Sequence, residues 1–184
     1  MNTILAALLY ALTAAGIPPL QATAQADVSV ELGVEIAARG EQLRLPVILS
    51  GKGKPVRSIA VRVTYPNARL QFAEAQPPSA AKDDAKDAEV TDVSAEAITA
   101  GKSDQGAIEV RVSSKSGAPL ADGIVALLVF KVPKEAEPGD VVVTNTARAT
   151  LEGSDEQPAA RVKDGVVTIL ETPPTVVACF FYMH

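Results

Sequence analysis

Histidine and cysteine are almost absent from this sequence of 184 residues. The single histidine is His184 and the single cysteine is Cys179, both within the last six positions. A Ser-His-Asp or Cys-His arrangement needs a positioned imidazole, and a zinc site usually needs several histidine or cysteine ligands. The chain also has no GxSxG, P-loop or CxxC motif, and one cysteine cannot form a disulfide within the chain. We therefore expect a protein that is not an enzyme and that uses no cofactor or metal.

Tryptophan is absent, aromatic residues make up 4% of the sequence, and there is no excess of basic residues. Seventeen Lys and Arg stand against 22 Asp and Glu, which gives a formal net charge of −5. Nucleic-acid binding depends on basic side chains that neutralise phosphates, so this balance argues against a nucleic-acid partner. Hydrophobic residues make up 47% of the chain, which is enough for the core of one domain.

The N-terminus has the pattern of a secretory signal. Residues 4–15 form an uninterrupted apolar run, two prolines follow it, and small residues then stand at Ala22, Ala24 and Ala26 with the spacing that signal peptidase accepts. No Lys or Arg precedes the run, but it is short for a bilayer span, which disfavours the alternative of an anchoring helix. We predict that residues 1–26 are a signal peptide and that the protein is secreted, to the extracellular space or the periplasm.

Alternation of apolar and polar residues predicts strands through most of the remaining chain. The alternating runs cover residues 28–36, 43–49, 59–65 and 108–112. In the first run Val34 and Ile36 continue the phase of Val28, so we expect them on the same face. Pro46, within the second run, indicates an edge strand or a bulge. Short strands, regular turns and the lack of a long helical periodicity predict an all-β sandwich.

Two stretches depart from this alternation. Residues 123–132 read GIVALLVFKV and are apolar on both faces, which predicts a central strand covered on both sides, with Leu128 in its middle. Residues 75–100 are rich in Ala, Asp, Glu, Lys, Pro and Ser, and their acidic residues do not follow the spacing of an EF-hand loop. We interpret this second stretch as a solvated loop and not as a calcium site, and we predict that residues 77–100 are the least ordered part of the domain.

Three segments carry a family likeness. Residues 58–72 read SIAVRVTYPNARLQF, residues 122–140 read DGIVALLVFKVPKEAEPGD, and residues 148–169 read RATLEGSDEQPAARVKDGVVTI. In this order they resemble the cohesin domain family: a strand that ends in tyrosine, an apolar strand with its turn, and a polar loop before the last strand. The resemblance implies a nine-stranded jelly-roll β-sandwich over residues 27–170, related in fold to some carbohydrate-binding modules.

The resemblance also implies binding instead of catalysis. Cohesins hold the dockerin modules of enzymes in cellulose-degrading assemblies, and an Asn and an Asp on the tyrosine-ending strand commonly contact the dockerin. The matching positions here are Ser58 and Ala60, whose side chains do not make the hydrogen bonds of an amide or a carboxylate. This chain is similar to the cohesin-like domains that occur singly in exported bacterial proteins. We expect an exported module that binds a protein, without the usual dockerin contacts, and the candidate partner-facing strand carries Ser58, Ala60, Arg62 and Thr64.

A carbohydrate-binding module on a related sandwich, with a polysaccharide as its partner, is the alternative. Sugar rings stack on exposed aromatic side chains, and the aromatic residues of the domain are Tyr65, Phe72 and Phe130. Tyr65 and Phe130 have the phase of core residues in their strands, which favours the protein-binding interpretation.

The end of the chain differs from the domain in composition. Residues 171–184 read as a short Pro-containing linker followed by an apolar tail, residues 176–183, that ends in His184. The tail is interpreted either as an edge strand or as the remnant of a longer anchor. Cys179 within it is interpreted as an ordinary apolar residue.

Overall fold

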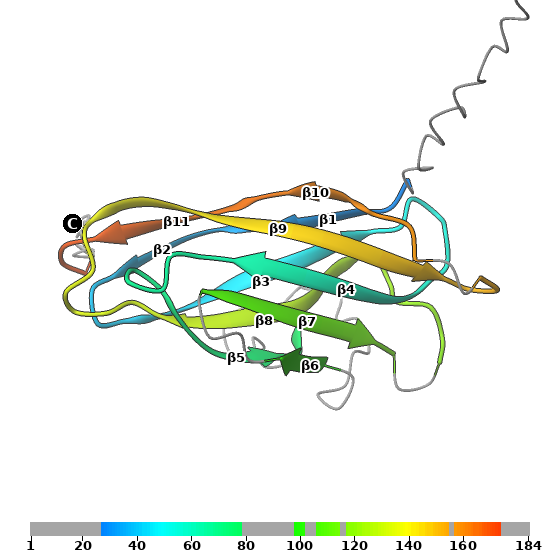
Figure 1. Cartoon of the computed structure of the whole chain (residues 1–184), viewed down its shortest axis with the longest axis horizontal. Coiled ribbons are helices and arrows are strands. Elements are labelled where there is room, and N and C mark those ends of the chain that lie inside the picture. Colours follow the sequence, from blue (N-terminus) through cyan, green and yellow to red (C-terminus); the bar gives the residue numbers. More distant parts are fainter. Residues whose placement is uncertain (1–26, 79–97, 102–105, 115–116, 155–156, 174–184) are drawn as a thin grey trace, which may run out of the picture.

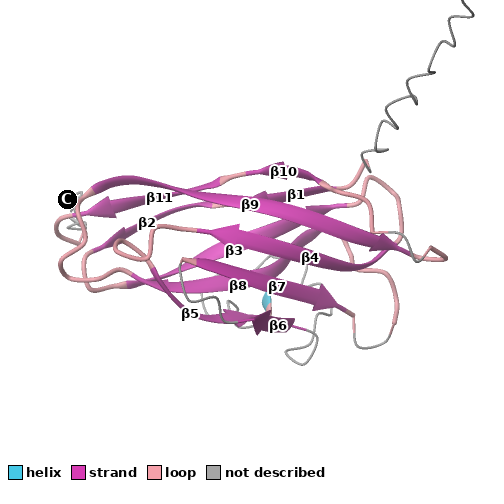
Figure 2. Cartoon of the chain, in the orientation of Figure 1, coloured by secondary structure: helices cyan, strands magenta, loops and turns pink. Residues whose placement is uncertain are grey.

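The computed structural model describes residues 27–78, 98–101, 106–114, 117–154 and 157–173. Within these ranges eleven strands form two sheets that pack face to face (Figure 1 and Figure 2). The chain is therefore an all-β sandwich, as its alternating pattern predicts.

Each sheet combines strands from both halves of the chain. In order across the five-stranded sheet lie β10 (Arg161–Lys163), β1 (Ser29–Leu32), β3 (Gln42–Ser50), β8 (Gly123–Lys131) and β5 (Gln71–Gln76). In order across the six-stranded sheet lie β2 (Val34–Ala38), β11 (Gly165–Leu170), β9 (Gly139–Leu151), β4 (Val56–Thr64), β7 (Ala107–Ser113) and β6 (Ile98–Gly101).

The first and last strands each change sheet part way along. β1 and β2 form one extended segment that changes sheet at Gly33, and β10 and β11 form another that changes at Asp164. Counting each segment once gives the nine strands that the family resemblance implies. The prediction for residues 28–36 is wrong in its second half, because Val34 is 69% exposed and Ile36 is 62% exposed. Side chains that point inward from one sheet point outward once the strand has crossed to the other.

The core lies between the sheets. The alternating apolar residues of 43–49, 59–65 and 108–112 are buried, as their pattern predicts. Six successive residues of β8, 125–130, are also buried, which confirms the central strand predicted around Leu128. Phe130 contacts the rings of Tyr65 and Phe72 edge to face, with centroids 5.0 and 5.7 Å away.

Pro46 lies in β3, which pairs with β1 on one side and β8 on the other. The expected edge position is therefore wrong, whereas the expected bulge is confirmed by a register shift between Val47 and Ile48. The carbonyl of Pro46 accepts a hydrogen bond from the amide of Gly33 at 2.9 Å. Since the two backbone groups of a strand residue point to the same side, the missing N–H of Pro46 falls where β1 leaves the sheet.

The strands reach further into the stretch 75–100 than the composition predicts, because residues 75–76 belong to β5 and residues 98–100 to β6. Residues 79–97, with the acidic side chains considered for calcium, lie outside the described residues, as do the signal-like segment 1–26 and the apolar tail 176–183 with Cys179. In the described ranges no helix is long and apolar enough to cross a membrane.

Candidate binding face

β4 lies between β9 and β7 in the six-stranded sheet (Figure 1). The structure places the four residues of the candidate partner-facing strand on the side away from the core. Ser58 and Ala60 are half-buried there, and Arg62 and Thr64 are exposed. Because β4 has a neighbour on both edges, its outward side chains form the middle of a wider surface.

The pairing of β4 with β9 and β7 sets four rows of outward side chains across this surface. From β9 through β4 to β7, the rows are Thr150, Ser58 and Ser113; Arg148, Ala60 and Arg111; Thr146, Arg62 and Glu109; and Thr144, Thr64 and Ala107. We call these twelve residues the β4 face. Its middle strand contributes two small side chains, so the face is low around Ala60 and Ser58.

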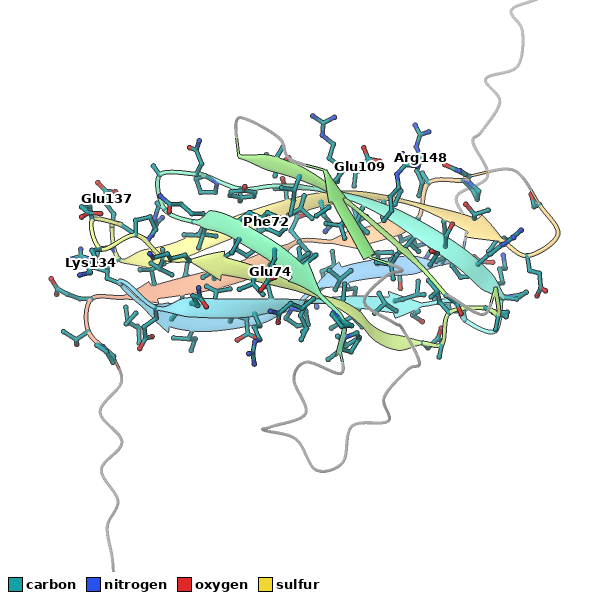
Figure 3. All side chains as sticks on the ribbon, turned by 90° about the horizontal axis from the view of Figure 1, so that it is seen from below. Phe72, Glu74, Glu109, Lys134, Glu137 and Arg148 are labelled. Atoms are coloured by element: carbon teal, nitrogen blue, oxygen red, sulfur yellow. The ribbon has the colours of Figure 1, made fainter. Side chains whose placement is uncertain are left out.

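Charge on the β4 face is concentrated in its two central rows. The guanidinium of Arg111 pairs with its neighbour on β7, Glu109, at 2.8 Å between Nη2 and Oε1. Within the described part of the chain neither Arg62 nor Arg148 makes an ion pair. Figure 3 shows the side chains of Glu109 and Arg148 on the same side of the sandwich. Two arginines are thus available to a partner.

A hollow of about 500 Å³ opens at one end of the β4 face. The residues that line it include Arg57, Ser58, Ser113, Thr150 and Gln157, whose side chains carry a guanidinium, three hydroxyls and an amide. A lining of hydroxyls with one guanidinium suits hydrogen-bond acceptors and anionic groups.

Groups for catalysis or for sugar stacking are not gathered at this face. Among the described residues no three His, Cys, Asp or Glu side chains lie where they would hold a metal ion. Tyr65 and Phe130 are buried in the core, and burial raises the pKa of the Tyr65 hydroxyl. The face therefore offers a surface for contact, built from arginines, hydroxyls and small side chains.

Strand phase alone identified the outward residues of β4 but not their neighbours. Arg148, Arg111 and Glu109 belong to β9 and β7, which lie far along the chain from β4. The alternation of β7 and β9 shows that these three side chains point outward. Only the pairing register shows that Arg148 and Arg111 flank Ala60.

The structure is thus a two-sheet sandwich with an open outward face on β9, β4 and β7. The family model of the cohesin domain matches residues 28–169. The chain therefore belongs to the cohesin domain family, whose members are non-catalytic modules for protein–protein binding. None of the curated proteins compared with the chain matches it in sequence.

Solved cohesin structures share the fold at low sequence identity. The sixth cohesin of scaffoldin B from Acetivibrio cellulolyticus is 20% identical over 78% of this chain and 99% of its own, with a TM-score of 0.63. A cohesin from Clostridium acetobutylicum is 19% identical over 83% and 96%, with a TM-score of 0.60. A non-cellulosomal cohesin from the archaeon Archaeoglobus fulgidus is 15% identical over 79% and 92%, with a TM-score of 0.56.

Proposed function

We propose that this protein is an exported binding module that docks a protein partner on the β4 face. The observation that carries the proposal is the position of β4 between β9 and β7, with an outward surface of small, hydroxyl and arginine side chains. A central strand is held by neighbours on both edges, so its backbone is fixed in place before the partner arrives, which lowers the entropic cost of docking.

The structural relatives support a protein as the partner. The cohesin from Acetivibrio cellulolyticus was solved in complex with a dockerin, and so was another from Clostridium thermocellum. The relative from Archaeoglobus fulgidus is described as non-cellulosomal. A cohesin fold therefore does not require a cellulose-degrading assembly, and a partner other than a cellulosomal dockerin is consistent with the family.

Export is the second element of the proposal. It is supported by the apolar run 4–15 and the small residues that follow it. Secretion with cleavage predicts a mature chain that starts at Gln25 or Asp27. N-terminal sequencing of the secreted protein tests this, and an intact Met1 in exported material contradicts it.

Carbohydrate binding remains the alternative for the same surface. It is less well supported because sugars stack on exposed aromatic rings, and in the domain Tyr65 and Phe130 are buried while Phe72 packs against Phe130. The polar hollow beside Ser58 offers hydrogen bonds to a sugar but no stacking platform within the described residues.

Photo-crosslinking tests the docking face directly. Benzoylphenylalanine placed at Thr64, on the β4 face, is expected to form a covalent adduct with an exported protein of the source organism. The matched control carries the same group at Gln42, an exposed residue of β3 in the other sheet. Adducts at both positions, or at Gln42 alone, contradict the proposal.

A further inference from the structure

The charge of the β4 face is opposite to that of the chain. The face and its adjoining hollow carry four arginines, Arg57, Arg62, Arg111 and Arg148, against one described acid, Glu109. Four positive charges and one negative charge leave a formal excess of three positive charges. The whole chain has a formal net charge of −5. The arginines are therefore a local concentration and not a reflection of a basic protein.

Two of these arginines flank a position with a small side chain. Arg148 and Arg111 occupy the same row, one on each side of Ala60. Neighbouring strands lie roughly 4.8 Å apart, so the two arginine backbones are about 10 Å apart with only a methyl group between them. A guanidinium binds a carboxylate through two parallel hydrogen bonds. The row can hold two carboxylates, with a small side chain of the partner above Ala60.

The acid already on the face does not block this arrangement. The pair between Arg111 and Glu109 is exposed, at 71% and 50% of the two side chains, and exposed pairs stabilise little. Arg62 and Arg148 form no ion pair with described residues. These arginines therefore lose little stabilising interaction with the rest of the protein when they bind a carboxylate of a partner.

We infer that the β4 face recognises a carboxylate-rich segment of its protein partner, an inference that rests on the proposed docking face. Other polyanions fit less well. Nucleic acids are long and uniformly charged, and this chain is acidic overall, so most of the molecule repels them. For an acidic polysaccharide, the twelve residues of the β4 face offer no aromatic side chain on which a sugar ring could stack. A protein segment needs only the few arginines and hydroxyls that the face supplies.

Fluorescence anisotropy with a defined probe tests the inference. The probe is a fluorescein-labelled peptide in which glutamate alternates with serine, and the comparison peptide has lysine in place of glutamate. The full chain is expected to bind the glutamate peptide, with an affinity that falls between about 50 mM and about 200 mM sodium chloride, and not to bind the lysine peptide. The variant with Arg62→Glu and Arg148→Glu is expected to weaken binding at least tenfold, that is, by ~1.4 kcal/mol or more.

Matched variants distinguish the effect of charge on the β4 face from the effect of the overall charge of the protein. Arg44→Glu with Lys131→Glu makes the same charge change at exposed positions of β3 and β8, on the other sheet, and is expected to leave binding within about twofold. Ala60→Asp puts a carboxylate between Arg148 and Arg111 and is expected to weaken binding as the double reversal does. Equal losses in the Arg44 and Lys131 variant, or no binding of the glutamate peptide, overturn the inference. Displacement of the peptide by polygalacturonate at lower concentration than by unlabelled peptide overturns the choice of a protein ligand.

The photo-crosslink at Thr64 distinguishes this inference from the proposed function. If the double arginine reversal leaves the adduct unchanged, the docking face stands and the charge inference fails. If the arginines bind the peptide but no adduct forms at Thr64, the proposed docking function fails.

Discussion

Gly165 and Gly33 lie backbone to backbone where the last and first strands change sheets. The amide of Val166 donates to the carbonyl of Gly33 at 3.2 Å. A Cβ on Gly165 would lie 2.9 Å from that same oxygen and 2.8 Å from the Cβ of Leu32. The two crossing segments run parallel in both sheets, and their close approach at this point needs a residue without a side chain.

Gly165→Ala is therefore expected to destabilise the domain. The added methyl group meets a backbone oxygen, so the strands must move apart, and overpacking of this kind typically costs about 1–3 kcal/mol. Thermal unfolding followed by circular dichroism measures the change. Gly101→Ala, where the nearest atom to the new Cβ is 3.8 Å away, is the control. A midpoint for Gly165→Ala equal to that of the control contradicts the packing described here.

Asn145 lies at the same crossing, on β9, and its side chain is buried at 6% exposure. Its Nδ2 donates to the carbonyl of Lys163 at 2.8 Å, and its backbone amide donates to the carboxylate of Asp164 at 2.9 Å. Asn145→Leu leaves the Lys163 carbonyl without this donor, and we expect a loss of about 1–3 kcal/mol in urea unfolding. Thr146→Val, on the outward side of the same strand, should change stability by less than about 0.5 kcal/mol. An Asn145→Leu variant with an unchanged free energy of unfolding would show that this hydrogen bond does not stabilise the crossing of the strands.

Leu128→Asp is expected to unfold the domain. Leu128 has no exposed surface in the centre of β8, and an unpaired carboxylate buried there costs several kcal/mol, on the order of the stability of such a domain. Ile124→Asp, on the same strand at 40% exposure, is the control and should remain folded. A soluble Leu128→Asp protein with an unchanged thermal midpoint would contradict the burial of this strand.

The burial of the alternating residues was predicted correctly where one strand stays in one sheet. From Ile59 to Val63, β4 keeps one phase of alternation, so period-two reasoning places Ile59 inward. The same rule applied to the sequence places Val34 and Ile36 inward. The segment crosses from one sheet to the other at Gly33, however, so these two side chains point outward. Nothing local marks that crossing except Gly33, whose missing side chain leaves room for the ring of Pro46 on β3.

In the candidate site, too, the sequence predicts only properties that belong to a single strand. Arg62 and Thr64 were assigned to the outward face from their phase alone, because that property belongs to a single strand. The row formed by Arg148, Ala60 and Arg111 depends on which strands pair and in which register. Those pairings are non-local, so the charge pattern of the β4 face appears only in the folded structure.

Glu35, on the edge strand β2, makes stability depend on pH. Desolvation on burial raises the pKa of its carboxyl. The folded state therefore holds this proton more tightly than the unfolded state, and stability is lost as pH rises from the ordinary glutamate pKa through the raised one. Glu35→Gln removes this cost, so its thermal midpoint should exceed that of the natural chain at pH 7. The gain should vanish below the ordinary glutamate pKa, where both side chains are neutral. A gain that is constant with pH would assign the effect to another cause.

Cellulosomal dockerins are not expected to bind this protein tightly. Ser58 and Ala60 stand where the family resemblance implies an amide and a carboxylate, and both residues lie on the middle strand of the β4 face. The loss of a polar anchor in a tight interface typically costs about 2 kcal/mol or more. Two such losses weaken binding roughly a thousandfold, at about 1.4 kcal/mol per tenfold.

The surroundings of Ala60 add to this loss. Arg148 and Arg111 flank the position where a carboxylate is missing, so basic side chains of a partner would meet like charges there. Restoring the acid with Ala60→Asp is expected to recover little affinity, because the new carboxylate would pair with those arginines. Calorimetric titration with a panel of dockerins measures this, with the Acetivibrio cellulolyticus cohesin and its Cel5 dockerin as the positive control. A nanomolar complex between the natural chain and any dockerin of the panel would show that Ser58 and Ala60 do not prevent the interaction, and that the arginines of the β4 face are compatible with it.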